Sequence, residues 1–215
     1  MSTQRNIRIM LADDHAVVRS GLRRLLEQRQ GLEVVAEAES GEQAYRLFSE
    51  HLPDVTVLDL SMPGMGGLEA VRRILARHPS ARMLVFSMHE NAAFATQALK
   101  AGARGYVAKT GAPEELVTAV QEVAKGKIYI STGVAQKIAM QSLDGGNEPV
   151  NQLSAREFEV FRMVAEGLGA EEVAYKLKIS QKTVANYLTL IKQKLGVSTP
   201  IEMLRLAMRH GMIEK

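Results

Sequence analysis

The 215-residue sequence contains no cysteine. This excludes disulfide bonds and metal sites built from thiolates, and it fits a reducing compartment. No apolar run approaches the ~20 residues that a membrane span requires. The apolar stretch after Arg8 ends within a few residues at Asp13-Asp14, unlike an export signal. We therefore expect a soluble cytoplasmic protein without membrane contact.

Acidic residues are absent between Glu172 and Glu202. Residues 1–125 hold 15 Lys and Arg against 15 Asp and Glu, whereas residues 151–215 hold 10 against 7, a net charge of +3. The acid-free interval carries five lysines: Lys176, Lys178, Lys182, Lys192 and Lys194. A helical surface of one charge sign favours contact with phosphates, although a solvated helix face has the same composition.

Short apolar runs alternate with longer helical patterns over the first 125 residues. The runs cover residues 7–12, 55–58, 83–86 and 105–108, and a further strand is expected near 33–37. The helical patterns cover residues 16–29, 42–50, 67–77, 92–101 and 113–125. This alternation predicts an α/β fold, a doubly wound five-stranded parallel sheet with right-handed crossovers.

Polar residues follow four of these runs: Asp13 and Asp14, Asp59, Ser87 and Lys109. Singly, each has an ordinary explanation, such as a helix cap for Asp14 or a solvated side chain for Lys109. Together they predict one site, because the strand ends of a parallel sheet share an edge. Each pair of carboxylates about 4 Å apart repels by on the order of 4 kcal/mol at an effective dielectric near 20. Lys109 and a divalent cation, with Mg²⁺ favoured, would relieve this repulsion and leave Asp59 as a nucleophile that accepts phosphate.

The loop after Asp59 contains Met62-Pro63-Gly64, a turn that holds the chain open beside the carboxylate. With this loop and the segment from Gly105-Tyr106 to Lys109, the residues resemble the flavodoxin-like receiver domain of two-component response regulators. One departure is Lys109-Thr110, where many receivers have Lys-Pro.

The receiver resemblance implies a role for each site residue. Asp59 would take a phosphoryl group from the phosphohistidine of a sensor histidine kinase, and Lys109 would stabilise it. Ser87 and Tyr106 would shift inward together as the switch. The magnesium ligands would be Asp13, Asp14, Asp59 and the carbonyl of Ser61.

The remaining chain predicts a linker at 126–152, with a short helix near 134–142 and a helix-breaking stretch at 144–149. From Leu153 the pattern is helical only, over 154–167, 170–177, 181–195 and 200–210. Ser154 and Glu157 have the spacing of a capping box, and Pro200 fits the first position of a helix. We therefore expect a receiver at 1–125 and a small all-α domain at 153–215.

The second and third of these helices have a helix-turn-helix pattern. The residues expected to form its shared core are Val173, Ala174, Leu177, Ile179, Val184 and Leu188. With Leu153-Ser154-Ala155-Arg156-Glu157 and Lys194-Leu195, they resemble the DNA-binding domain of NarL/FixJ or LuxR-type regulators.

This resemblance implies that the helix from Gln181 enters the major groove. The residues placed for base contact are Ala185, Asn186 and Thr189, and those placed for backbone contact are Lys182, Thr183, Tyr187, Lys192 and Lys194. Asn186 is the favoured base reader because its amide can pair with adenine twice. Ala185 and Tyr187 depart from the basic residue and histidine that are common in the family, so a site preference does not carry over.

Two dimer contacts are expected. The final helix carries Met203, Leu204, Leu206, Ala207 and Met212, assigned first to the domain core, and the resemblance implies that part of its face pairs two DNA-binding domains. A receiver face with Arg19, Arg23 and Val120 is a second, weaker candidate.

The predicted function is phosphorylation-dependent transcriptional regulation by a homodimer that forms on phosphorylation or DNA binding. Its partners would be a cognate sensor histidine kinase and double-stranded promoter DNA, with RNA polymerase a further candidate. Apart from self-phosphorylation and autodephosphorylation at Asp59, we expect no enzyme activity. The alternatives are a phosphate-independent DNA-binding regulator and a metal-dependent phosphohydrolase, and the latter lacks the two-apart Asp pair of aspartyl-phosphate hydrolases.

Overall fold

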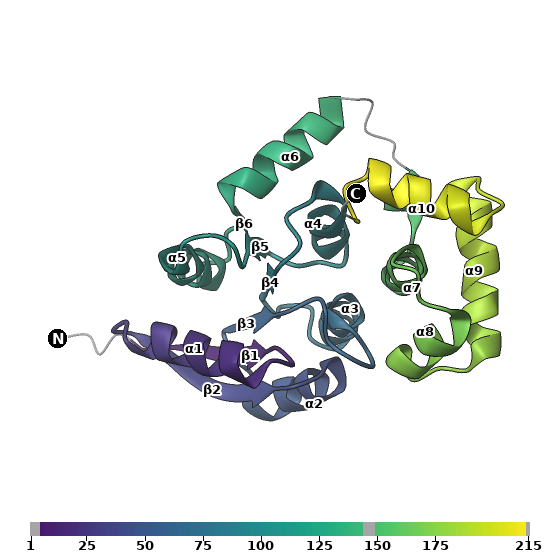
Figure 1. The fold of residues 1–215 in the computed structure, drawn as a ribbon. Helices are drawn as coiled ribbons and strands as arrows, with labels where there is room; N and C mark the ends of the chain where they lie inside the picture. Colours follow the sequence, from purple (N-terminus) through teal and green to yellow (C-terminus); the bar gives the residue numbers. More distant parts are fainter. Residues whose placement is uncertain (1–4, 144–148, 214–215) are drawn as a thin grey trace. The chain divides into compact units, whose positions relative to one another are not determined.

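A computed structural model describes residues 5–143 and 149–213 (Figure 1). It divides into two compact units, one of residues 1–88 and 98–132 and one of residues 89–97 and 133–215. The helix-breaking stretch predicted at 144–149 lies outside the described residues, except for Pro149. No helix in the described part of the chain is long and apolar enough to cross a membrane.

The first unit is built on a parallel sheet of order β2-β1-β3-β4-β5-β6. Its strands are β1 Ile7–Ala12, β2 Leu32–Ala38, β3 Val55–Leu58, β4 Met83–Ser87, β5 Gly105–Ala108 and β6 Tyr129–Ile130. The predicted α/β class is confirmed, but the predicted number of five strands is wrong. The sixth strand, β6, is two residues long and adds to the sheet only through its pairing with β5. So short a strand has no periodicity to detect.

Helices cover the sheet on both faces (Figure 1). The helices of this part of the chain are α1 Ala16–Glu27, α2 Gly41–His51, α3 Gly67–Arg77, α4 Ala92–Lys100 and α5 Pro113–Ala124. Helices α1 and α5 share one core with the sheet, in which Leu26 and Leu116 pack against strand residues such as Ile9 and Val57. The bounds predicted for α3 are confirmed.

The register of the sheet sets which strand ends meet. Ala12 of β1 is paired with Leu58 of β3, so the next residues, Asp13 and Asp59, leave the sheet side by side. The Asp59 N–H donates to the Ala12 carbonyl at 2.8 Å. On the other side, the Lys109 N–H donates to the Ser87 carbonyl at 2.8 Å. The sheet therefore delivers the predicted polar residues to one edge.

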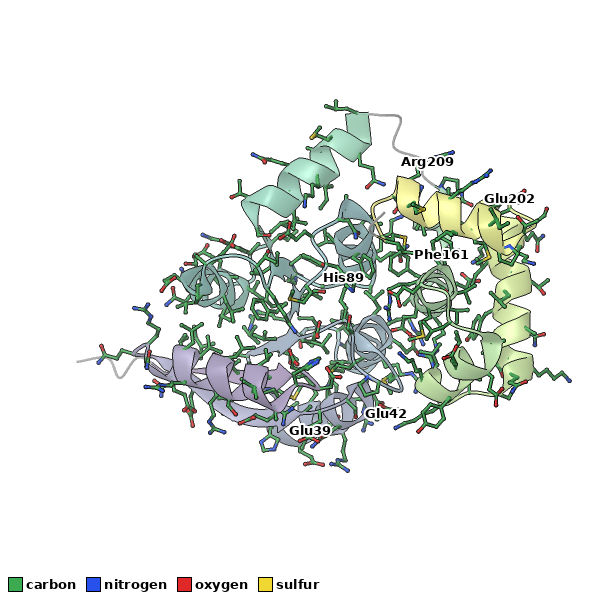
Figure 2. All side chains as sticks on the ribbon, in the orientation of Figure 1. Glu39, Glu42, His89, Phe161, Glu202 and Arg209 are labelled. Carbon is green, nitrogen blue, oxygen red and sulfur yellow. The ribbon has the colours of Figure 1, made fainter. Side chains whose placement is uncertain are left out.

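The second unit is helical. Its elements are the greater part of α4, then α6 Thr132–Leu143, the 3₁₀ turn η1 Pro149–Gln152, α7 Ala155–Ala165, α8 Ala170–Leu177, α9 Gln181–Leu195 and α10 Pro200–Arg209. The predicted helix-turn-helix core is confirmed, because Val173, Ala174, Leu177 and Val184 are buried and Ile179 and Leu188 are half-buried. Phe158 of α7 is fully buried, and so is Phe161 (Figure 2).

Side-chain caps define the starts of these helices. The Glu157 N–H donates to Ser154 Oγ, and the Ser154 N–H donates to Glu157 Oε2 at 2.7 Å, which confirms the predicted capping box. Pro200 opens α10 as predicted. Thr199 and Glu202 form a second capping box there that was not predicted (Figure 2).

Three residues that the sequence analysis assigned to the domain core or to a dimer face have a different environment in the structure. Leu204 of α10 is 38 % exposed, because its neighbour Met203 occupies the buried face of the helix. Arg19 and Val120 are buried and cannot form an exposed dimer face. Val120 packs in the core against the sheet, and the guanidinium of Arg19 turns inward to the Asp13 carbonyl. The proposed receiver dimer face is therefore wrong for these two residues.

Candidate functional site

The carboxyl ends of β1, β3 and β5 bring Asp13, Asp59 and Lys109 into direct contact. Lys109 Nζ lies 2.6 Å from Asp13 Oδ2 and 2.9 Å from Asp59 Oδ2, and it donates a hydrogen bond to each. All three side chains are buried. Burial alone would lower the pKa of Lys109, but the hydrogen bonds and charges of Asp13 and Asp59 outweigh it and raise the pKa. The ammonium is therefore held in its charged form between two carboxylates.

Asp14 and His15 complete the cluster. Ligand atoms of Asp13, Asp14, His15 and Asp59 all lie within 4.8 Å of one another. His15 Nδ1 is 3.0 Å from Asp14 Oδ1, and the His15 N–H donates to Asp13 Oδ1 at 2.8 Å. His15 was not predicted as a site residue, although its place next to Asp13-Asp14 was a signal in the sequence. The cluster holds more carboxylate than ammonium.

One oxygen of the site is buried without a hydrogen bond. Asp59 Oδ1 has no partner among the described residues, whereas Asp59 Oδ2 accepts from Lys109. A buried carboxylate oxygen without a donor is costly to desolvate, so it indicates a missing cation or a reacting group. The donor set, three carboxylates at one edge, fits a hard divalent cation such as Mg²⁺.

The loop after β3 is held close to Asp59. A side chain at Gly67 would clash with the Asp59 carbonyl, so this position requires glycine. Ser61 lies in this loop and is exposed. The role of its carbonyl as a metal ligand stays a prediction.

Ser87 and Tyr106 lie on neighbouring strands. Ser87 ends β4 and Tyr106 is the second residue of β5, and both side chains are fully buried. Lys109 reaches the carboxylates from the end of the same β5 strand. Burial of both side chains is an observation on this structure alone, and the switch role of Ser87 and Tyr106, with its coupled movement, stays a prediction.

A second candidate surface lies on α9. Lys182, Ala185, Asn186 and Thr189 are exposed, while Val184, Ile191 and Leu195 are buried, so the predicted base-reading residues share the outer face of the helix. Tyr187 and Lys192 are half-buried beside it.

Three of the predicted DNA contacts already bond within the protein. Ser180 caps α9 by accepting the Thr183 N–H at 3.1 Å, and the Thr183 hydroxyl lies 2.8 Å from the Ser180 hydroxyl in a second hydrogen bond. Thr189 Oγ1 donates to the Ala185 carbonyl at 3.0 Å. Lys194 Nζ donates to the buried Glu157 at 2.6 Å, so its backbone contact to DNA stays a prediction that competes with this ion pair.

Comparison with known proteins identifies a family for each of the two parts of the chain. Residues 9–121 match the family model of the response regulator receiver domain, and residues 151–207 match that of the bacterial regulatory proteins of the luxR family. The chain is 39 % identical over 210 residues to the response regulator GacA of Pseudomonas viridiflava, covering 97 % of this chain and 98 % of that one. This chain belongs to the response regulators.

Further relatives support the same assignment. The response regulator UvrY of Escherichia coli K12 is 36 % identical over 208 residues, covering 96 % of this chain and 95 % of that one. The solved structure of RcsB from Salmonella enterica, bound to the promoter rprA in the presence of the phosphomimetic BeF₃⁻, has a TM-score of 0.71. It is 31 % identical and covers 94 % of this chain and 98 % of that one. The response regulator therefore combines a receiver with a LuxR-type DNA-binding domain, and it is a regulator rather than a classical enzyme.

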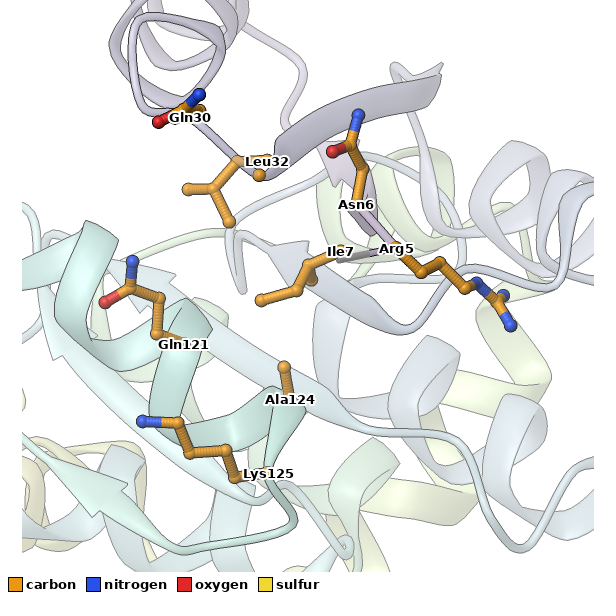
Figure 3. A pocket seen from close by; sticks show the side chains of 9 residues that line it. Arg5, Asn6, Ile7, Gln30, Leu32, Gln121, Ala124 and Lys125 are labelled. Carbon is orange, nitrogen blue, oxygen red and sulfur yellow. The ribbon is translucent and has the colours of Figure 1, made fainter. Parts of the chain in front are cut away.

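A cavity in the first unit lies apart from the acidic cluster of the response regulator. A cavity of about 770 Å³ lies at the opposite edge of the sheet, where β1 and β2 begin (Figure 3). Its lining consists of Arg5, Asn6, Ile7, Gln30, Gly31, Leu32, Gln121, Ala124 and Lys125. None of these residues is a carboxylate, and no predicted site residue is among them. The chemistry of the protein is therefore concentrated in the acidic cluster rather than in this cavity.

Proposed function

We propose that this protein regulates transcription by binding promoter DNA when Asp59 is phosphorylated. The observation that carries the proposal is Lys109 bonded to both Asp13 and Asp59 in a chain that also bears a LuxR-type DNA-binding domain. The phosphoryl donor is the phosphohistidine of a cognate sensor histidine kinase. Small acyl phosphates provide the same phosphoryl group for self-phosphorylation.

Asp59 Oδ1 is the nucleophile, because it is the oxygen of the carboxylate that Lys109 does not occupy. It forms a bond to phosphorus as the bond from phosphorus to the donor's imidazole nitrogen breaks. The bonding electrons stay on that nitrogen, and the product is an acyl phosphate on Asp59. Lys109 remains beside Asp59 Oδ2 and offsets the added negative charge. In autodephosphorylation, water attacks the same phosphorus and the bond between phosphorus and Asp59 Oδ1 breaks, so that the Asp59 carboxylate, inorganic phosphate and a proton are the products.

The carboxylates of Asp13, Asp14 and Asp59 and the Ser61 carbonyl would hold Mg²⁺. Magnesium supplies positive charge that neutralises the phosphoryl oxygens during transfer. Lys109 and the bound cation together balance a cluster whose carboxylates otherwise repel one another. In the phosphorylated state the Ser87 hydroxyl would donate to the phosphate, and Tyr106 would move inward with it.

On DNA, α9 occupies the major groove. Asn186, Ala185 and Thr189 face the bases, and Lys182 with Thr183, Tyr187, Lys192 and Lys194 contact the phosphate backbone. Two subunits bind as a homodimer that phosphorylation or DNA promotes. Activation of a promoter adds contact with RNA polymerase.

The test combines intact mass, sedimentation and DNA binding for the wild type and Asp59→Asn, with Mg²⁺ and acetyl phosphate or beryllium fluoride. Asp54→Asn is a matched control, because its amide oxygen can still accept the Arg8 N–H and the change removes only a long ion pair, 3.8 Å, to the exposed Arg5. We expect the wild type and the control to gain the mass of one phosphate and to bind DNA more tightly, and Asp59→Asn to do neither.

Three outcomes contradict the proposal. Full phosphate-stimulated DNA binding by Asp59→Asn would remove Asp59 as the switch. Equal DNA binding by the wild type with and without every donor would indicate a phosphate-independent regulator. Steady turnover of a small phosphoester with Mg²⁺ would instead favour the phosphohydrolase.

A further inference from the structure

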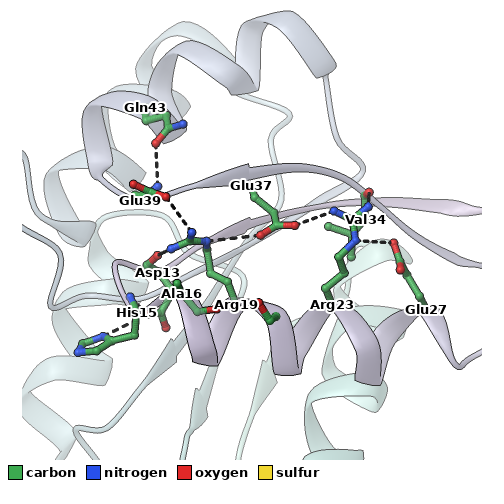
Figure 4. A network of polar contacts seen from close by, with 11 residues as sticks. Asp13, His15, Ala16, Arg19, Arg23, Glu27, Val34, Glu37, Glu39 and Gln43 are labelled. Carbon is green, nitrogen blue, oxygen red and sulfur yellow. Dashed lines mark hydrogen bonds and ion pairs between the residues drawn. The ribbon is translucent and has the colours of Figure 1, made fainter.

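Arg19 is a buried arginine next to the acidic cluster (Figure 4). It lies in the first turn of α1, and its side chain is 9 % exposed. Its Nη1 donates to the main-chain carbonyl of Asp13 at 2.7 Å, and its Nη2 donates to Glu39 Oε1 at 2.9 Å. Its Nε lies 3.4 Å from Glu37 Oε2. The guanidinium therefore joins the loop after β1 to the end of β2.

These contacts fix the main chain at Asp13 from both sides. The Asp13 N–H donates to the Ala38 carbonyl of β2 at 3.1 Å, and the Asp13 carbonyl accepts from Arg19. That carbonyl belongs to the peptide that joins Asp13 to Asp14. The orientation of this peptide sets the directions of the Asp13 and Asp14 side chains, and so the distance between their carboxylates. Arg19 thus acts on the acidic cluster without any contact to its carboxylate oxygens.

The partners of Arg19 are themselves held in place by further hydrogen bonds. Glu37 Oε1 also accepts from Arg23 at 2.6 Å, and Arg23 Nε donates to Glu27 at 3.1 Å (Figure 4). The Glu39 N–H donates to Gln43 of α2 at 2.9 Å. Arg19 alone of the two arginines reaches Asp13, which makes Arg23 a natural comparison within the same network.

We propose that Arg19 is a positioning residue of the phosphorylation site, which sets the Asp13–Asp14 peptide so that the carboxylates can hold a divalent cation. The inference rests on the proposed function. The planar fork of arginine serves three partners at once, the Asp13 carbonyl, Glu37 and Glu39, and a lysine ammonium at the same place cannot match that geometry.

The charge of Arg19 and its positioning role predict opposite changes in the affinity for Mg²⁺ when Arg19 is replaced. Arg19 is a cation near a cation site, so loss of its charge alone should strengthen the binding of Mg²⁺. Loss of positioning should weaken it, because groups that orient metal ligands change metal affinity by about 10- to 100-fold when they are removed. The sign of the change therefore separates the two effects.

The experiment measures the affinity of the full chain for Mg²⁺ and Mn²⁺ by calorimetry in the wild type, Arg19→Gln, Arg19→Lys and Arg23→Gln. Circular dichroism checks the fold, which should survive in Arg19→Gln because Glu39 is exposed and Glu37 half-buried, so water can solvate both. We expect about 10-fold or more weaker binding in Arg19→Gln, partial rescue in Arg19→Lys, and no weakening in Arg23→Gln. If Arg19→Gln disturbs the fold, Arg19→Lys alone carries the comparison with Arg23→Gln.

Phosphorylation by acetyl phosphate gives the second readout. In Arg19→Gln, saturating Mg²⁺ should restore most of the rate, because the nucleophile Asp59 and its partner Lys109 are unchanged. Cation binding of wild-type strength in a folded Arg19→Gln, or equal weakening in Arg23→Gln, would overturn the inference. Absence of phosphate on wild-type Asp59 would instead overturn the proposed function, and the cation affinities would still decide the role of Arg19.

Discussion

At the scale of single residues, Thr56 is a polar residue in the centre of the sheet. It lies in β3, is fully buried, and its Oγ1 has no hydrogen-bond partner among the described residues. A buried hydroxyl without a partner keeps its desolvation cost, and valine has the same shape without that cost. We expect Thr56→Val to raise the free energy of unfolding by about 1 kcal/mol, measured by urea denaturation.

Thr118→Val is the control for this change. Thr118 is exposed on α5, and its Oγ1 donates to the Glu114 carbonyl of the preceding turn. Its replacement should change stability by no more than about 0.5 kcal/mol. A clear destabilisation by Thr56→Val would mean that the hydroxyl has a partner, such as a bound water.

At the scale of elements, α2 ends with strained backbone. Leu52 has φ 45° and ψ 61°, the left-handed conformation that disfavours residues with a side chain, and it is 58 % exposed. Glycine at this position would relieve about 1–2 kcal/mol of backbone strain. This gain exceeds the entropic penalty of about 0.5–1 kcal/mol that glycine brings. We expect Leu52→Gly to raise the free energy of unfolding by about 0.5–1 kcal/mol in urea denaturation. Leu52→Ala keeps the Cβ and should give no such gain; an equal gain would mean that the exposed leucine, not the backbone, was unfavourable.

The start of α7 should make the second unit sensitive to acid. Glu157 is 5 % exposed; burial alone would raise its pKa, but the hydrogen bonds from Lys194 and Ser154 outweigh this and lower it. A carboxyl with a lowered pKa stabilises the folded state above its unfolded pKa, and this stability is lost as the pH falls through the folded value. We expect Glu157→Gln to lower the free energy of unfolding by about 1 kcal/mol at pH 7.

The difference between the wild type and Glu157→Gln should shrink as the pH falls below about 4.5. Urea denaturation from pH 7 down to pH 3 measures it. Glu166→Gln is the control, because Glu166 pairs with Arg162 at the other end of the same helix and is not part of the capping box. A difference that stays constant with pH would show that Glu157 contributes by shape and not by charge.

The sequence predicts elements with clear local signals and misses contacts that depend on strand register. The bounds of α3 follow from Gly66 and Gly67 at its start and from His78-Pro79 after its end. The inward turn of Arg19 depends on Glu37 and Glu39, about 20 residues away and brought close only by the pairing of β1 with β2. The sequence contains no local signal for these contacts, and the assignment of Arg19 to an exposed dimer face was therefore wrong.

At the scale of the whole molecule, one chain joins a phosphate-accepting site to a nucleic-acid surface, and the two have opposite electrostatic needs. The acidic cluster concentrates carboxylates that require cations. Between Glu172 and Glu202 the sequence has lysines and no acidic residue, which suits contact with the phosphates of DNA. Separation of the two sites in the sequence keeps the carboxylates out of the DNA-binding helix. DNA affinity should therefore depend on salt through α9 and not through the receiver.

Two residues of α9 should separate affinity from specificity. Lys182 is exposed and would neutralise one phosphate, so Lys182→Gln should weaken binding to all sequences and make the log-log salt slope less steep by about 0.9 per subunit. Asn186→Ala should instead cost about 1–3 kcal/mol on the preferred site only. Fluorescence anisotropy across a salt series, on specific and scrambled DNA, measures both.

Lys127→Gln is the control for the salt slope, because Lys127 pairs with Glu122 in the first unit. It should leave the slope unchanged, although it removes the same charge from the chain. An equal change of slope in Lys127→Gln and Lys182→Gln would mean that DNA responds to the net charge of the protein. A change in Lys182→Gln alone would place a phosphate contact at the start of α9, where the N-terminal residues of a recognition helix meet DNA.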